Sequence, residues 1–245
     1  MNLQLQNWNN FCRYHVGEWR GINTRYSSGE EVIDSWNVVT NLKISQDGSK
    51  INHEDYLIYA DGKTELKTFG PYIKPITSAL FLDNSFCWGS KTLETNSIFI
   101  FEIGLRCENR RVLAFIKYGN DGSLEYISIS PQLLSTNVSE QSKTSVLTIT
   151  KENWQGKLKT IEPDLMVLEP VDISWISLKD LNRDNLTLNF QDNISVSCPQ
   201  NIKKDMEFCI ALDWLANSVL LQRGIGYYDV SGFKHFNLQI FTPIY

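Results

Sequence analysis

The chain has 245 residues, of which 42% are hydrophobic and 21% charged, and this composition excludes a chain that is disordered throughout. Its formal net charge of −5 disfavours a dedicated nucleic-acid-binding protein, because neutralising phosphates requires clustered Lys and Arg side chains. The basic pairs Arg110-Arg111 and Lys203-Lys204 stand alone, and we interpret both as solvated turn residues.

The five cysteines are spread along the chain without a CxxC pair, which favours free thiols in a reducing compartment. The segment from Met1 to Trp19 is polar and has no apolar signal core. No run approaches the roughly 18 apolar residues of a membrane-spanning helix. We therefore expect a cytoplasmic protein without a membrane span.

The first predicted element is one short amphipathic helix that ends at Gly17. Its apolar side chains recur at helical spacing, at Leu5, Trp8, Phe11, Cys12 and His15. Beyond Gly17 the apolar period changes to two, which indicates β-strands. In the first half we expect strands at 18–26, 35–44, 55–59, 63–69, 79–82, 86–89, 97–105, 111–118 and 124–129.

The segment from Gln132 to Thr144 is polar and is interpreted as a linker or long loop. Behind it, strands are expected at 146–150, 156–161, 165–168, 172–178, 186–190, 194–197, 206–214, 218–228 and 233–241. Within the 218–228 strand, Gly224-x-Gly226 is interpreted as a bulge or bend. Many short strands with frequent turns predict an all-β sandwich or barrel.

The two halves also share a weak internal repeat. Each contains the pattern Trp-x-Gly, then an apolar strand, then a hairpin with the pattern Tyr-x-x-x-Gly and a closing strand. The hairpin pattern stands at Tyr118 to Gly122 and at Tyr228 to Gly232. We therefore predict an N-terminal unit at 1–131, a linker at 132–145 and a C-terminal unit at 146–245.

A family resemblance adds to this pattern. The stretch from Asn9 to Gly21, which contains Gly17-x-Trp19, and its continuation from Thr24 to Ser27 resemble the start of the DUF3598 family. Arg223-x4-Tyr228-Asp229-x-x-Gly232 resembles the closing hairpin of that family, a calycin-like group frequent in cyanobacteria and photosynthetic eukaryotes. The resemblance implies antiparallel lipocalin-like barrels in two related halves, with the N-terminal helix closing a barrel floor and Trp19 packed over it.

The family name carries no activity. Calycin relatives include lyases that attach bilins to phycobiliproteins, and double-barrel proteins that hydrate or cyclise isoprenoid or polyketide chains, but these are analogies of fold only. No metal site is predicted, because His15, His53 and His235 lie far apart in the sequence. No nucleophile motif or phosphate-binding loop occurs either, and no cofactor is expected.

Strand parity gives the best site argument. If Trp19 points into a barrel, then Arg25 points inward too, and an inward charge needs a partner, an anionic ligand or a place at the wet rim. Aromatic side chains line cups that bind flat molecules, although they are also favoured in β cores. The candidate ligand-binding residues are Trp19, Arg25, Trp36, Trp88, Tyr118, Trp214 and Tyr228.

Glu102 and Asp213 are candidate general acids on corresponding strands, but the sequence leaves open whether they face solvent or a pocket.

Three functions remain. The first is binding of a small hydrophobic or pigment-like molecule, such as a bilin, isoprenoid or polyketide. The second is a cyclase, hydratase or lyase acting on such a molecule, and the third is a protein-interaction module with filled barrels. The oligomeric state stays open.

Overall fold

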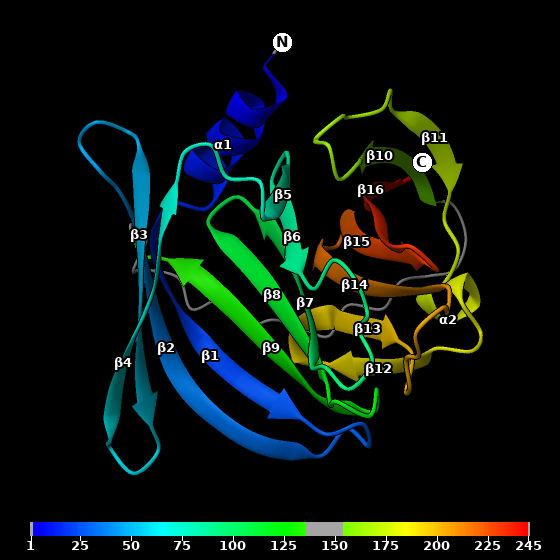
Figure 1. The fold of residues 1–245 in the computed structure, drawn as a ribbon, viewed down its shortest axis with the longest axis horizontal. Coiled ribbons are helices and arrows are strands. Elements are labelled where there is room, and N and C mark those ends of the chain that lie inside the picture. Colours follow the sequence, from blue (N-terminus) through cyan, green and yellow to red (C-terminus); the bar gives the residue numbers. More distant parts are fainter. Residues whose placement is uncertain (1, 136–153, 245) are drawn as a thin grey trace.

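Two antiparallel β-sheets packed face to face, with a short helix at one end, make up the fold of this computed structural model (Figure 1). The structure describes residues 2–135 and 154–244. The expectation of a mostly antiparallel β protein with a short N-terminal helix is confirmed. None of the helices in the described residues is long and apolar enough to cross a membrane.

The first sheet has nine strands in the order β4-β3-β2-β1-β9-β8-β7-β6-β5, and every neighbouring pair is antiparallel. It curls into a half-barrel in which β3 and β4 lie across from β6 to β8 (Figure 1). Its strands are β1 (Gly17–Tyr26), β2 (Val32–Ile44), β3 (Lys50–Tyr59), β4 (Thr64–Ile73), β5 (Ala79–Leu82), β6 (Ser85–Gly89), β7 (Phe99–Cys107), β8 (Arg110–Tyr118) and β9 (Leu124–Leu134).

Helix α1 (Leu3–Tyr14) closes one end of the half-barrel. Asn2 caps its N-terminus, and its buried face packs Trp8 and Phe11 against side chains of β2, β3 and β5. Asn7 is also buried, and its side chain bonds the carbonyls of Ile76 and Ala79 and the amide of Phe81. These bonds satisfy backbone groups at and beside the edge strand β5, and thereby hold the helix in place.

The second sheet has seven strands in the order β11-β10-β16-β15-β14-β13-β12. This is the order β2-β1-β9-β8-β7-β6-β5 of the first sheet, with no counterparts of β3 and β4 among the described residues. The internal repeat is therefore visible in the connectivity. The strands are β10 (Trp154–Ile161), β11 (Val171–Ser174), β12 (Leu186–Phe190), β13 (Ile194–Cys198), β14 (Phe208–Asn217), β15 (Leu220–Asp229) and β16 (Gly232–Pro243).

The main core lies between the convex face of the half-barrel and the facing side of the second sheet. Alternate residues of β7 and β14 meet there, and all are at most 6% exposed: Phe99, Phe101, Ile103, Leu105, Phe208, Ile210, Leu212 and Trp214. Gly224 and Gly226 do not form the expected bulge, because both pair regularly with β14. They are small so that side chains of β7 can approach: a Cβ on Gly226 would lie 2.2 Å from the ring of Phe101.

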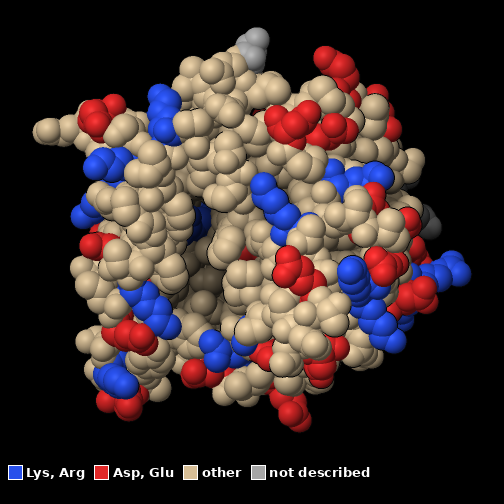
Figure 2. All heavy atoms as spheres, in the orientation of Figure 1, with Lys and Arg blue, Asp and Glu red and all other residues tan. Residues whose placement is uncertain are grey.

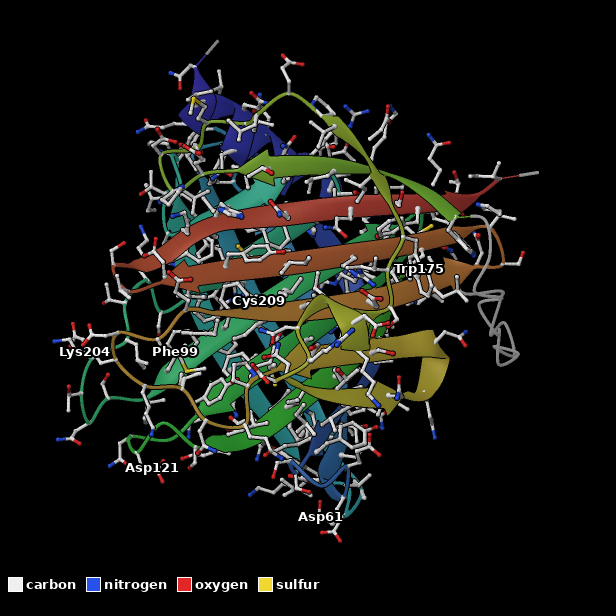
Figure 3. The ribbon with its side chains drawn as sticks, turned by 90° about the vertical axis from the view of Figure 1, so that its right-hand side faces the viewer. Asp61, Phe99, Asp121, Trp175, Lys204 and Cys209 are labelled. Atoms are coloured by element: carbon white, nitrogen blue, oxygen red, sulfur yellow. The ribbon has the colours of Figure 1, made fainter. Side chains whose placement is uncertain are left out.

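The outer face of the second sheet is covered by its own chain. The segment from β11 through α2 (Leu178–Leu181) crosses this face, with Trp175 on the segment and Cys209 on the strand beneath it (Figure 3). Arg223 of β15 is fully buried there and forms two hydrogen bonds to the carboxylate of Asp213 on β14, at 2.6 and 2.8 Å. It also donates to the carbonyl of Ile176 in the covering segment.

The expected boundary between two units falls near residues that are not described. Of the predicted linker at 132–145, residues 136–145 lie outside the described residues, as does the predicted strand at 146–150. Strand β9 extends to Leu134. The division at 131 and 146 stays a prediction.

Candidate functional site

The concave face of the half-barrel carries charged and polar side chains among apolar ones, whereas the convex face of β7 to β9, which packs on the second sheet, is apolar. In β7 the buried convex residues alternate with Ile100, Glu102 and Arg106, which are partly exposed and face the concave side. We call this concave face and the hollow that it encloses the cup. Figure 2 shows the hollow from the open side, with basic side-chain atoms at its wall. A concave face that combines apolar side chains with charged groups and curls around a hollow differs from the interior of a filled barrel, and indicates a binding surface.

One row of side chains crosses the cup from β1 to β6. The strand registers place its members directly opposite one another in pairs, so all five share the concave face: Arg25, Ser128, Phe115, Glu102 and Trp88. Arg25 and Glu102 are separated by three strand spacings, or about 14 Å along the sheet. The row thus carries a cation at one end, a carboxyl group toward the other and an aromatic ring between them.

Arg25 is held by aromatic rings. Its guanidinium carbon lies 4.3 Å from the ring centroid of Tyr126 and 5.3 Å from that of Trp36. The buried Nε of Arg25 has no hydrogen-bond partner, and neither do the buried Nε1 of Trp36 and Oδ1 of Asn23 on the same wall. Within the described residues the side chain of Arg25 forms no ion pair. A cation stacked on aromatic rings and left without an anion is suited to an acidic ligand.

Glu102 lies on the opposite wall. It accepts a hydrogen bond from Nε1 of Trp88 on β6. Burial raises the pKa of Glu102 to about 7, an increase that the hydrogen bond from Trp88 and the nearby charges of His53 and Arg111 partly oppose. The side chain is partly exposed to the hollow, yet protein atoms surround it, so the charged form is poorly hydrated. A carboxyl group with a pKa near 7 can both donate and accept a proton at neutral pH.

Three side chains of β3 and β4 form a chain of hydrogen bonds facing Glu102. The ring nitrogens of His53 lie 2.9 Å from the hydroxyl of Tyr72 and 3.1 Å from the carboxylate of Asp55. Burial, with the charges of Glu102 and Asp55, raises the pKa of Tyr72 to about 12. Tyr72 therefore keeps its proton at neutral pH and remains a hydrogen-bond donor.

Arg111 and Trp19 form the floor. Arg111 is 3% exposed, its guanidinium carbon lies 4.3 Å from the ring centroid of Trp19, and its Nε donates to the side chain of Gln132 at 2.7 Å. The interpretation of Arg111 as a solvated turn residue is wrong, because it lies inside β8 and points into the cup. Burial lowers its pKa to about 9, although the charges of Glu102 and Asp55 oppose that decrease, so Arg111 is a cation at neutral pH.

His15 lies beneath this floor, at the end of α1. It is 1% exposed, packs against the rings of Phe81 and Phe86, and has no partner for either ring nitrogen. Burial and the charges of Arg111 and Arg106 hold its pKa well below the usual value. His15 is thus a neutral packing residue, as expected from its place on the helix.

The structure brings together four of the seven predicted ligand-binding residues, namely Trp19, Arg25, Trp36 and Trp88, all on the concave face. The other three, Tyr118, Trp214 and Tyr228, lie in the core between the sheets. The hydroxyls of the two tyrosines bond the carbonyls of Pro199 and Ser90 there.

Sequence reasoning missed His53, Asp55, Tyr72 and Arg111. A signal for the first two was present, because they alternate with exposed residues in a strand whose Ile51 and Leu57 face the same way. Asp213, the other candidate general acid, is instead paired with Arg223 on the covered outer face of the second sheet.

A second hollow of about 310 Å3 lies at one end of the sandwich, among the loops at 92–95, 203–206 and 229–232. Its lysines, Lys203 and Lys204, are exposed as predicted, and its Asp229 pairs with Lys234 at 2.9 Å. None of the unpartnered buried polar atoms of the described residues belongs to the lining of this hollow. The cup is therefore the better candidate.

Comparison with known proteins identifies the family. The model of the N-terminal domain of unknown function DUF3598 matches residues 4–129. A crystal structure of a protein of unknown function from the DUF3598 family of Nostoc punctiforme has 18% sequence identity and a TM-score of 0.78, and the match covers 97% of this chain and 99% of that chain. This likeness supports the fold described above.

Two further structures match weakly. The S-type phycobiliprotein lyase from Guillardia theta has 8% identity and a TM-score of 0.23, with 99% of this chain and 96% of that chain covered. Kievitone hydratase from Nectria haematococca has 7% identity and the same TM-score, with 94% and 90% covered. At such scores neither structure adds to the argument. No curated protein matches the chain.

Proposed function

The chain belongs to the DUF3598 family, and we propose that its cup binds a small, elongated, conjugated molecule that carries an acidic group. The observation that carries this proposal is the row from Arg25 to Trp88. Arg25 offers a cation without an anionic partner in the described residues, and Phe115 offers an apolar surface beside it. Bilins combine a conjugated body with acidic groups, as do those isoprenoid acids and polyketide acids whose chains are conjugated.

The row also limits the size of the ligand. With the acidic group at Arg25, about 14 Å of conjugated chain reaches Glu102 along the sheet, and less where the curl shortens the path. The aromatic rings of Trp36, Tyr126 and Trp88 supply flat surfaces along that path. A filled interaction module does not fit the first half, because its inward face is hollowed and carries charged groups (Figure 2).

Retinoic acid and retinol form a matched pair of probes, since they share a conjugated body and differ in the carboxylate. We expect quenching of tryptophan fluorescence by both, with retinoic acid binding at least tenfold more tightly, about 1.4 kcal/mol. Arg25→Gln is expected to remove this preference while leaving retinol binding unchanged.

Arg20→Gln is the control, because Arg20 lies on the same strand but faces outward and is exposed. It should leave both affinities unchanged. Equal affinities of the native protein for the two probes, or equal effects of the two substitutions, would contradict a cup that recognises an acidic group.

A further inference from the structure

The cup contains ionisable groups that binding alone does not require. Glu102 is an unpaired carboxyl group in the middle of the apolar part of the row, next to Phe115 and Trp88. A carboxylate that serves only to anchor a cation would be paired with Arg111 or Lys117, yet neither forms an ion pair with it among the described residues. By contrast, the buried carboxylate of Asp213 accepts two hydrogen bonds from Arg223, as expected of a charged group with a structural role.

We propose that Glu102 moves a proton on the molecule that the cup binds, so that the protein catalyses a non-redox isomerisation or elimination of a conjugated substrate. This inference rests on the proposed binding function. The carboxylate takes a proton from an activated carbon, the electron pair of that C–H bond moves into the conjugated system, and a proton returns at another carbon or a leaving group departs with its electrons. No oxidant, reductant or cofactor is needed for this balance.

The surroundings of Glu102 suit this role. The ionisable groups that share the concave face come from seven strands: Arg25 of β1, Asp34 of β2, His53, Asp55 and Tyr59 of β3, Glu65, Lys67 and Tyr72 of β4, Arg106 of β7, Arg111 and Lys117 of β8, and Tyr126 of β9. Arg111, a cation, and Tyr72, a neutral hydroxyl, act electrostatically with Glu102. Both can stabilise negative charge that develops on the substrate as the proton leaves.

The tendency of Glu102 to take up a proton near pH 7 supports the same role. A general base whose pKa equals the working pH is half ionised at that pH. It is therefore available to accept a proton while still being basic enough to remove one. Burial raises the pKa of Glu102 to about 7, and Trp88 opposes the rise through its hydrogen bond. Trp88 is therefore a positioning residue, which orients the carboxylate and sets the pH at which it works.

The test uses 5-nitrobenzisoxazole, a flat aromatic probe with one activated C–H bond. When a base removes that proton, the electron pair forms a nitrile, the N–O bond breaks, and a coloured phenolate is released. We expect a saturable rate that rises with pH to a plateau with a midpoint near 7. Glu102→Gln should reduce the rate at least tenfold while quenching of tryptophan fluorescence still reports bound probe.

Two further variants separate catalysis from structure. Glu94→Gln changes an exposed carboxylate outside the cup and should leave the rate unchanged. Trp88→Phe should move the midpoint of the pH profile upward, a change that a merely structural role would not produce. Bound probe with a rate that Glu102→Gln does not alter would overturn the proton-transfer inference and leave the binding function standing. A probe that neither quenches fluorescence nor reacts would count against both.

Discussion

The indole Nε1 of Trp88 donates a hydrogen bond to the carboxylate of Glu102, across the pair of strands β6 and β7. Trp88 is the more exposed partner, with 39% of its surface accessible, so the bond forms part of the wall of the cup rather than of the core. The bond stabilises the charged form of a carboxyl group whose burial favours the neutral form.

Loss of this bond should raise the pKa of Glu102 further. In Trp88→Phe the carboxyl group keeps its buried position but loses a donor to its charged form, so we expect a pKa above the value of about 7 in the native protein. A carbon-13 NMR titration of the glutamate carboxyl signals measures it, with Glu102→Gln to assign the resonance. An unchanged or lower pKa in Trp88→Phe would contradict the role given to the indole.

Glu102 should also make the protein less stable as the pH rises. Its pKa is about 7 in the folded protein and near the ordinary value of 4.5 in the unfolded chain, so the folded state holds the proton more tightly. The stability is therefore greatest below pH 4.5 for this group and falls between pH 4.5 and 7. Glu102→Gln should be more stable than the native protein at pH 8, by up to about 3 kcal/mol, and equal to it at pH 4. Urea unfolding at both pH values measures the difference.

His15 should act in the opposite direction. Burial holds the pKa of His15 in the folded protein well below the ordinary value of 6.5, whereas the unfolded chain takes up a proton near that value. Stability is therefore lost as the pH falls below 6.5. His15→Phe keeps the ring contacts with Phe81 and Phe86 and removes the titration, so it should be more stable than the native protein at pH 5 and similar at pH 8. Parallel stability curves for the two proteins between these pH values would exclude this explanation.

Removal of the Asn7 side chain should weaken the attachment of α1. Asn7→Ala leaves two carbonyls and one amide without partners in a buried place, each costing about 1 to 3 kcal/mol unless water enters. We expect a loss of at least about 3 kcal/mol in urea unfolding. Asn10→Ala is the control, since Asn10 makes one partly buried bond to the carbonyl of Phe81 and should cost about 1 kcal/mol.

The pair of Asp213 and Arg223 should show strong coupling. Asp213→Leu leaves a buried guanidinium without its anion and should cost about 3 to 5 kcal/mol, whereas the double substitution with Arg223→Met should recover most of that loss. The exposed pair of Lys157 and Asp172, at 2.8 Å, provides the comparison, and Asp172→Ala should cost less than about 1 kcal/mol. Additive losses in the Asp213 and Arg223 double mutant would show that the two charges do not depend on each other.

The sequence predicts the parity of β1 correctly, because one buried tryptophan determines the direction of every second residue. Trp19 points inward, and Arg25 therefore does too. The sequence could not determine whether the side chain of Glu102 points into the cup or away from it. One face of β7 packs against the second sheet, and the other is enclosed by the curl of the first sheet. Only the position of the second sheet shows that the Glu102 face lines the cup.

The remaining site residues depend on the curl of the sheet. His53 and Tyr72 act on Glu102 across the cup although about 50 and 30 residues separate them in the sequence, a proximity that local periodicity does not contain. The prediction that Arg111 is solvated is wrong for a local reason. It follows a turn, where a pair of arginines is usually solvated, yet the strand begins at Arg110 and turns the next side chain onto Trp19.

The back-to-back packing of the two sheets has a consequence for how the cup can change. On β7 and β8 the residues that hold the sheets together alternate with those that line the hollow. A substitution at Ile100, Glu102 or Phe115 alters the chemistry of the hollow without touching the core beneath it. The second sheet, whose outer face is covered by its own chain, supports the half-barrel from behind. The specificity of the cup can therefore change through substitutions at every second residue of β7 and β8.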